Sequence, residues 1–147
     1  MKIFIDADAC PVVHETESLA KKYKIDCIAF CDTSHIPSLS YAKKITVSKG
    51  SDSVDFALVN QIQSEDIVVT QDYGLAAMCL SKHAHVIRQD GLIYTDDNIE
   101  GLLQIRYTEG KIRRSGGRTK NHPKRTQSDN RKYEESLEKL IIFCKNN

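Results

Sequence analysis

Acidic residues stand where apolar segments of this sequence end. Residues 3–5 read Ile-Phe-Ile, a short apolar run typical of a strand buried on both faces, and Asp6 and Asp8 follow it directly. A second apolar run, residues 66–70, is followed by Asp72. In open α/β sheets the carboxyl ends of parallel strands meet at one edge, and ligands bind there. We therefore expect these three carboxylates to lie close together at such an edge.

Two more acids belong to the start of a predicted helix. Residues 54–62 carry apolar side chains at helical spacing, and Asp52 and Asp55 share a face of its first turn because they are three residues apart. Converging carboxylates raise one another's pKa values or require a cation. Oxygen ligands of this kind suit Mg²⁺ or Mn²⁺, which accept a few carboxylates and keep several waters. The predicted metal ligands are Asp6, Asp8, Asp52, Asp55 and Asp72.

Such a site can activate water and stabilise charge on a phosphodiester. In this interpretation Asp6, Asp8 and Asp72 hold the metal. Asp55, with Asp52 as its deputy, completes the ligand set or orients the attacking water. The predicted catalytic residues are therefore Asp6, Asp8, Asp55 and Asp72.

Two other interpretations of these acids stay open. In the first, Asp8 serves solely as the cap of a helix that begins near Pro11, because Asp is a favoured cap and Pro a favoured first helical residue. Residues 5–9, Ile-Asp-Ala-Asp-Ala, also resemble the opening motif of haloacid-dehalogenase-type phosphatases. That motif would need Asp96 and Asp97 as its later acidic pair, but Asp97 is expected to cap the helix that follows it.

The remaining pattern predicts alternating strands and helices. Expected strands cover residues 3–5, 26–31, 44–48, 66–70 and 84–88, with a hairpin or short edge element at 91–95. Expected helices cover residues 12–23, 54–62, 75–80, 98–103 and 130–144. This alternation predicts a three-layer α/β domain with a mostly parallel sheet. The length of 147 residues predicts a single domain over the whole chain.

The net charge of +1 conceals a segregation of charge along the chain. Residues 111–132 contain nine basic residues and one acid, a net charge of +8, while the remainder carries −7. A basic segment beside an acidic body is common in proteins that handle polyanions. The predicted phosphate contacts are Arg113, Arg114, Arg118, Lys120, Lys124 and Arg125. The alternative is a solvated loop, because Gly116, Gly117 and Pro123 favour irregular backbone.

The cysteines and the apolar segments indicate the compartment. Five cysteines without C-x-x-C spacing favour reduced, buried thiols over a disulfide framework or a zinc site. No segment approaches the roughly 18 consecutive apolar residues of a membrane span. We therefore expect a cytoplasmic protein with no membrane partner, and its oligomeric state stays open.

Four stretches together resemble one family of bacterial proteins. They are Asp6-Ala-Asp-Ala-Cys-Pro11, Gly50-Ser-Asp52-Ser-Val-Asp55, Val68-Val-Thr-Gln-Asp72 with Leu75-Ala-Ala, and Ser128-Asp-Asn-Arg131. In this order, over nearly the whole chain, they resemble the YaiI/YqxD family of uncharacterised bacterial proteins. That family looks like a PIN-like group, and PIN domains are typically metal-dependent ribonucleases with acids at the strand ends of a parallel sheet.

The resemblance implies roles for particular residues of this chain. It puts Asp6, Asp8, Asp72 and one or both of Asp52 and Asp55 in a metal cluster. It also implies that Thr70 helps to position the metal site or the substrate. The sequence departs from the family at His122-Pro123, where Gly-Pro is common, and at Tyr133, where Phe is more usual.

Two functions from different classes follow. The first is a Mg²⁺- or Mn²⁺-dependent nuclease, a hydrolase acting on RNA or single-stranded nucleic acid. The second is a non-catalytic nucleic-acid-binding module whose acids bind a structural ion. Metal-dependent cleavage discriminates between them.

Overall fold

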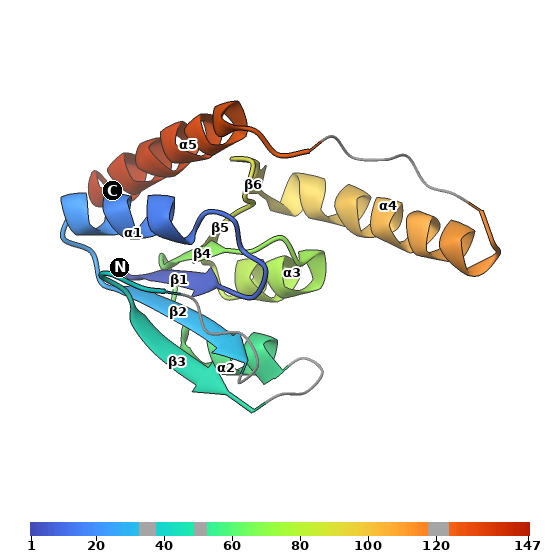
Figure 1. Cartoon of the computed structure of the whole chain (residues 1–147), viewed down its shortest axis with the longest axis horizontal. Coiled ribbons are helices and arrows are strands. Elements are labelled where there is room, and N and C mark those ends of the chain that lie inside the picture. The colour runs from blue at the N-terminus through green and yellow to red at the C-terminus, as the bar shows by residue number, and fades with distance from the viewer. Residues whose placement is uncertain (33–37, 49–52, 118–123) are drawn as a thin grey trace.

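The computed structural model describes residues 1–32, 38–48, 53–117 and 124–147, and within them the chain forms one six-stranded sheet flanked by helices (Figure 1). The strands are β1 (Ile3–Asp6), β2 (Cys27–Asp32), β3 (Lys43–Val47), β4 (Ile67–Val69), β5 (His85–Ile87) and β6 (Ile93–Tyr94). The helices are α1 (Val13–Lys22), α2 (Ser53–Gln61), α3 (Tyr73–Ser81), α4 (Asp96–Arg114) and α5 (Gln127–Lys145). The predicted α/β class is confirmed.

The strand order β3-β2-β1-β4-β5-β6 places β1 in the middle of the sheet. β1 pairs in parallel with β2 on one side and with β4 on the other, and only β6 runs antiparallel among the described strands. The chain therefore builds outward from β1 in one direction and later in the other. The point between β1 and β4, where this direction reverses, leaves a crevice at the carboxyl edge of an open sheet.

Side chains on β1 alternate between two hydrophobic cores, one on each face of the sheet. Ile3 and Ile5 belong to the core covered by α1 and α5, while Phe4 belongs to the core covered by α2, α3 and the start of α4. Figure 1 shows α1 and α5 together on one side of the strands. The result is the three-layer arrangement that the sequence predicts, and it is compatible with a PIN-like fold.

Two expectations about α4 are wrong. The helix was expected over 98–103, but it runs from Asp96 to Arg114 and extends away from the sheet (Figure 1). Ile99 is its one buried residue, and the apolar residues of its outer turns, Ile105, Tyr107 and Ile112, are exposed. Its cap is Thr95 rather than Asp97, because the Thr95 hydroxyl accepts from the Asn98 N–H and the Asn98 side chain accepts from the Thr95 N–H.

The cysteines fit the sequence expectation, and none of the five forms a disulfide. Cys27, Cys31 and Cys79 are buried, and desolvation raises the pKa of the Cys27 and Cys79 thiols to about 12. Such thiols stay protonated and unreactive at neutral pH. Separately, none of the helices in the described ranges is both long enough and apolar enough to cross a bilayer.

Candidate active site

A pocket of about 490 Å³ opens at the carboxyl edge of the sheet, where β1, β2 and β4 end. Four of the predicted acids line it together. Its lining residues are Asp6, Asp8, Asp32, Val54, Asp55, Gln71, Asp72 and Arg106. The strand-end rule thus brings carboxylates from β1, β2, α2 and the β4–α3 connection to one cavity.

Thr70 links the acids of β1 and the β4–α3 connection. Its hydroxyl donates to Oδ2 of Asp6 at 2.8 Å and accepts from the backbone N–H of Asp72 at 3.0 Å. The Asp72 carboxylate caps α3, because Oδ1 accepts from the N–H groups of Gly74 and Leu75 at 2.9 and 3.1 Å. Both capping hydrogen bonds use Oδ1 of Asp72, and Oδ2 takes part in neither. The threonine fixes both acids relative to each other.

The electrostatics of the pocket are concentrated on Asp6. Burial raises the pKa of this carboxyl from 3.8 to about 6, since desolvation outweighs the hydrogen bond from Thr70 and the negative charges of Asp72 and Asp8 add to it. A nearby positive charge stabilises the ionised form of a carboxyl whose pKa is raised in this way. The pocket therefore favours a cationic ligand beside Asp6.

Asp8 lies on the β2 side of the pocket and does not cap α1. Both of its carboxylate oxygens lie 3.3 Å from the backbone N–H of Asp32. The N-cap of α1 is Val12, and no side chain caps that helix. The capping interpretation of Asp8 is therefore wrong, because the loop after β1 carries the residue back toward the end of β2 instead.

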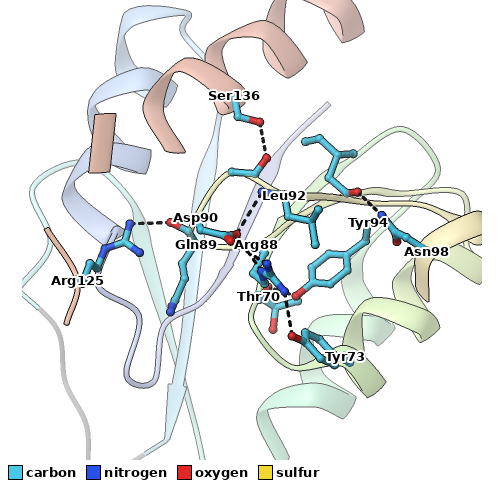
Figure 2. Close-up of polar contacts among 12 residues, drawn as sticks. Thr70, Tyr73, Arg88, Gln89, Asp90, Leu92, Tyr94, Asn98, Arg125 and Ser136 are labelled. Carbon is cyan, nitrogen blue, oxygen red and sulfur yellow. Dashed lines mark hydrogen bonds and ion pairs between the residues drawn. The ribbon is translucent and has the colours of Figure 1, made fainter. Parts of the chain in front are cut away.

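A polar network behind the pocket holds Thr70 and the β5–β6 turn in place (Figure 2). The buried Tyr94 hydroxyl donates to the backbone oxygen of Thr70 at 3.2 Å. Arg88 donates to both oxygens of Asp90 at 2.8 and 2.7 Å and to the Tyr73 hydroxyl at 2.9 Å. These contacts tie the turn to α3 and to the end of β4, so they support the backbone that positions Thr70.

The basic residues fall into two groups that serve different ends. Arg113 and Arg114 are exposed on the last turn of α4, and Lys124 is exposed before α5. Arg125 is instead held by the protein, because its guanidinium donates to the Gln89 carbonyl at 2.6 Å (Figure 2). It also donates to the Asn130 side chain at 2.8 Å. None of these four lines the carboxylate pocket as described. The predicted residues Asp52, Arg118 and Lys120 lie outside the described residues.

Two residues of the pocket were missed by sequence reasoning. Asp32 directly follows the apolar residues of β2. The rule that selects Asp6 and Asp72, an acid at the end of an apolar strand, would also have selected Asp32. Arg106 has no local signal. It reaches the pocket because α4 passes beside α3, which brings its Nη1 to 3.3 Å from Oδ1 of Asp72.

The donor set fits a hydrated oxygen-seeking ion better than a tightly enclosed one. Within the described ranges, no three His, Cys, Asp or Glu side chains are grouped so that they could hold a metal ion. The acids that line the pocket nevertheless supply carboxylate oxygens as ligands. Burial and the charges of Asp72 and Asp8 disfavour the ionised form of Asp6, which a cation would stabilise. Mg²⁺ commonly binds through one or two carboxylates and keeps several waters. The arrangement matches that mode.

The acids required by the phosphatase interpretation lie elsewhere. Asp96 and Asp97 occupy the exposed first turn of α4, and neither lines the carboxylate pocket. Asp6 and Asp8 therefore lack the later acidic pair in the described structure. The geometry does not support that interpretation.

Comparison with known proteins identifies the family. The family described as "Uncharacterized BCR, YaiI/YqxD family" matches residues 4–142. The chain belongs to this family. Curated relatives named "UPF0178 protein" include one from Ruminiclostridium cellulolyticum, 51% identical over 99% of this chain and 93% of the relative. Another, from Lachnoclostridium phytofermentans, is 50% identical over 96% of this chain and 97% of the relative. No solved structure matches the chain.

Proposed function

We propose that this protein is a Mg²⁺- or Mn²⁺-dependent nuclease that acts on RNA or single-stranded nucleic acid. The observation that carries the proposal is the shared pocket at the β1–β4 crevice, in which Asp6, Asp8 and Asp72 lie with the cationic Arg106. Cleaving a phosphodiester needs a cation near the phosphate and a group that positions water. The carboxylates of the pocket attract the cation, and one of them positions the water.

Each acid has a separate task in this proposal. Asp6, Asp8 and Asp72 would hold a hydrated ion, one or two of them directly and the rest through its waters, and Thr70 keeps Asp6 and Asp72 in register through its hydroxyl. Asp55, from the first turn of α2, accepts a proton from the attacking water or orients it, with Asp52 as its deputy. The bound ion supplies Lewis-acid stabilisation of the phosphate and a more acidic water.

Arg106 and the outer turns of α4 extend the site for a polyanion. Arg113 lies seven residues beyond Arg106, so the two share a helix face and stand about 10 Å apart along the axis. The arginines thus form a basic stripe, Arg106, Arg113 and Arg114, that leads outward from the carboxylate pocket. An extended strand would follow this stripe with its phosphates.

The decisive experiment is cleavage of a single-stranded RNA oligomer with and without Mn²⁺. Wild-type protein should cleave only with the ion, and Asp6→Asn should abolish cleavage while the fold is kept. Asp97→Asn is the matched control, because Asp97 is an exposed acid outside the pocket. Soaking crystals with Mn²⁺ should add density between Asp6 and Asp72.

Either of two results would defeat the proposal. Cleavage that persists in Asp6→Asn would remove the carboxylate pocket from the reaction. RNA binding without any Mn²⁺-dependent cleavage would instead identify a binding module.

A further inference from the structure

A second pocket of about 420 Å³ adjoins the carboxylate pocket and adds apolar side chains to its lining. It shares Asp55, Asp72 and Arg106 with the first pocket. Its own lining residues, which we call the Phe56 subsite, are Phe56, Gly74, Leu75 and Met78. Its size lies within the range of small-molecule sites, about 300–1,000 Å³.

The Phe56 subsite is built from side chains that the hydrophobic core does not use. On α2, Val54 and Leu58 face the core, while Phe56 between them is 61% exposed. On α3, Leu75 is buried at the floor, while Met78 is 37% exposed. Two helices thus present an aromatic ring and a thioether on the same side of the carboxylates, and both groups offer flat or adaptable apolar contact.

We infer that the Phe56 subsite binds the unpaired nucleobase next to the phosphate that lies in the carboxylate pocket. This inference rests on the proposed function and specifies its substrate as a strand with accessible base faces. An exposed aromatic ring stacks on any base, whereas a base inside a duplex has both faces covered by its neighbours. The subsite would therefore select single strands without reading their sequence.

Arg106 and Gly74 connect the two pockets. The Arg106 side chain is 58% exposed, lines both cavities and contacts Asp72 at 3.3 Å, so a cation stands between the base position and the acids. A nucleotide presents a flat base, then a sugar, then an anionic phosphate, so a base in the Phe56 subsite would bring its phosphate within reach of the Arg106 cation. Gly74 carries no side chain, and a Cβ there would lie 3.3 Å from Oδ1 of Asp72. Its absence leaves room beside that carboxylate.

The chain contains no tryptophan, so a single substitution gives a direct reporter of base stacking. We would prepare Phe56→Trp in an Asp6→Asn background, which keeps the RNA intact, and titrate it with a single-stranded RNA hexamer. Stacking of a base on the indole should quench its fluorescence. A hexamer with the same phosphate backbone but abasic sugars should bind more weakly and leave the fluorescence unchanged.

Phe143→Trp in the same background is the matched control. Phe143 is an exposed phenylalanine, 58% accessible, on α5, and it lines neither pocket. Its substitution should give no base-dependent quenching. Phe56→Ala should weaken binding of the ordinary hexamer about tenfold and bring it to the affinity of the abasic one. A blunt RNA duplex should show little quenching with Phe56→Trp.

The outcomes separate this inference from the proposed function. Equal quenching by ordinary and abasic hexamers, or no quenching, overturns the Phe56 subsite. A loss of affinity in Phe56→Ala that is the same for both hexamers also overturns it. Mn²⁺-dependent cleavage by the single Phe56→Trp variant is measured in parallel. Cleavage without quenching leaves the nuclease proposal standing alone, while quenching without cleavage leaves the base subsite standing and removes the hydrolytic step.

Discussion

Opposite ends of the same strand pair carry aspartates in contrasting environments. At the amino edge, Asp66 precedes β4 and is buried, with Oδ1 accepting from the Lys2 N–H at 2.9 Å and Oδ2 from the Gln63 N–H at 2.8 Å. At the carboxyl edge, Asp6 accepts only one hydroxyl hydrogen bond, and burial, with the charges of Asp72 and Asp8 adding to it, raises its pKa to about 6. The comparison separates a carboxylate whose two oxygens both accept backbone hydrogen bonds from one that burial and neighbouring acids disfavour in its charged form.

The largest effect should come from removing the satisfied carboxylate. Asp66→Ala leaves two backbone N–H groups near the sheet without their partner, and each hydrogen bond to a charged acceptor contributes about 1.5–3 kcal/mol. We expect the free energy of unfolding to fall by about 3 kcal/mol in chemical denaturation. Asp97→Ala, at an exposed position, should change it by less than about 1 kcal/mol. Equal losses in the two variants would contradict the distinction between the edges.

Asp6→Asn should instead raise the free energy of unfolding of the metal-free protein. The pKa of Asp6 is about 6 in the folded chain and 3.8 ordinarily, so ionisation opposes folding. This penalty is absent below pH 4, grows between pH 4 and 6, and is complete above about pH 6. The variant should therefore be more stable than wild type at pH 7.5 by about 1–3 kcal/mol and equal to it at pH 3.5.

Adding Mn²⁺ sharpens the same comparison. Wild-type protein should gain stability with ion concentration by mass action, whereas Asp6→Asn should gain little. Thermal denaturation over a Mn²⁺ series measures both, and calorimetry gives the affinity. A wild type whose stability does not respond to Mn²⁺ would mean that the surplus charge at the carboxyl edge does not serve a cation.

The basic stripe should contribute to RNA affinity but not to stability. Replacing Arg106, Arg113 and Arg114 with Gln removes up to three phosphate contacts, each worth about −0.7 in the slope of log affinity against log salt. We expect that slope to flatten by about two units in a fluorescence titration. Arg125→Gln is the counterpart, since its guanidinium holds Gln89 and Asn130, and it should lower stability by about 1 kcal/mol with the slope unchanged. The reverse pattern would place the phosphate path near α5.

A comparably small effect on stability should follow from Tyr94→Phe. This change keeps the buried ring and removes the hydroxyl that donates to the Thr70 carbonyl. The expected cost is about 0.5–1.5 kcal/mol of stability. Because Thr70 positions Asp6 and Asp72, Mn²⁺ affinity should fall a few-fold as well. Tyr107→Phe, on the exposed surface of α4, should alter neither quantity.

The sequence predicted the parts of the site that depend on strand ends. Ile3 to Ile5 and residues 67–69 are apolar runs of strand length, and parallel pairing then forces Asp6 and Asp72 to the same edge. Asp32 was not predicted, although the same rule applied to β2 selects it. These features are local in sequence, and the topology of parallel sheets supplies the rest.

Features that depend on tertiary packing were beyond that reasoning. Arg106 enters the pocket through the path of α4, a helix with little apolar periodicity, so neither its length nor its direction is written in a short window. Arg125 was predicted to contact phosphate like its basic neighbours, but its guanidinium donates a hydrogen bond to the Gln89 carbonyl. The sequence pattern assigned Phe56 no role, and only its exposure beside Met78 of α3 reveals that it lines a pocket.

The central place of β1 has a consequence for how the chain reaches its native state. β2 joins β1 early, but β4 pairs with the other side of β1 through contacts such as Ile3 with Ile67, and Asp6 meets Thr70 across a separation of 64 residues. Closing a loop of this length delays folding relative to local pairing. During synthesis β1 is therefore an apolar edge strand, open to pairing with other chains until β4 emerges. The same pairing brings Asp6 beside Thr70, so a single step covers the open edge of β1 and joins two parts of the carboxylate pocket.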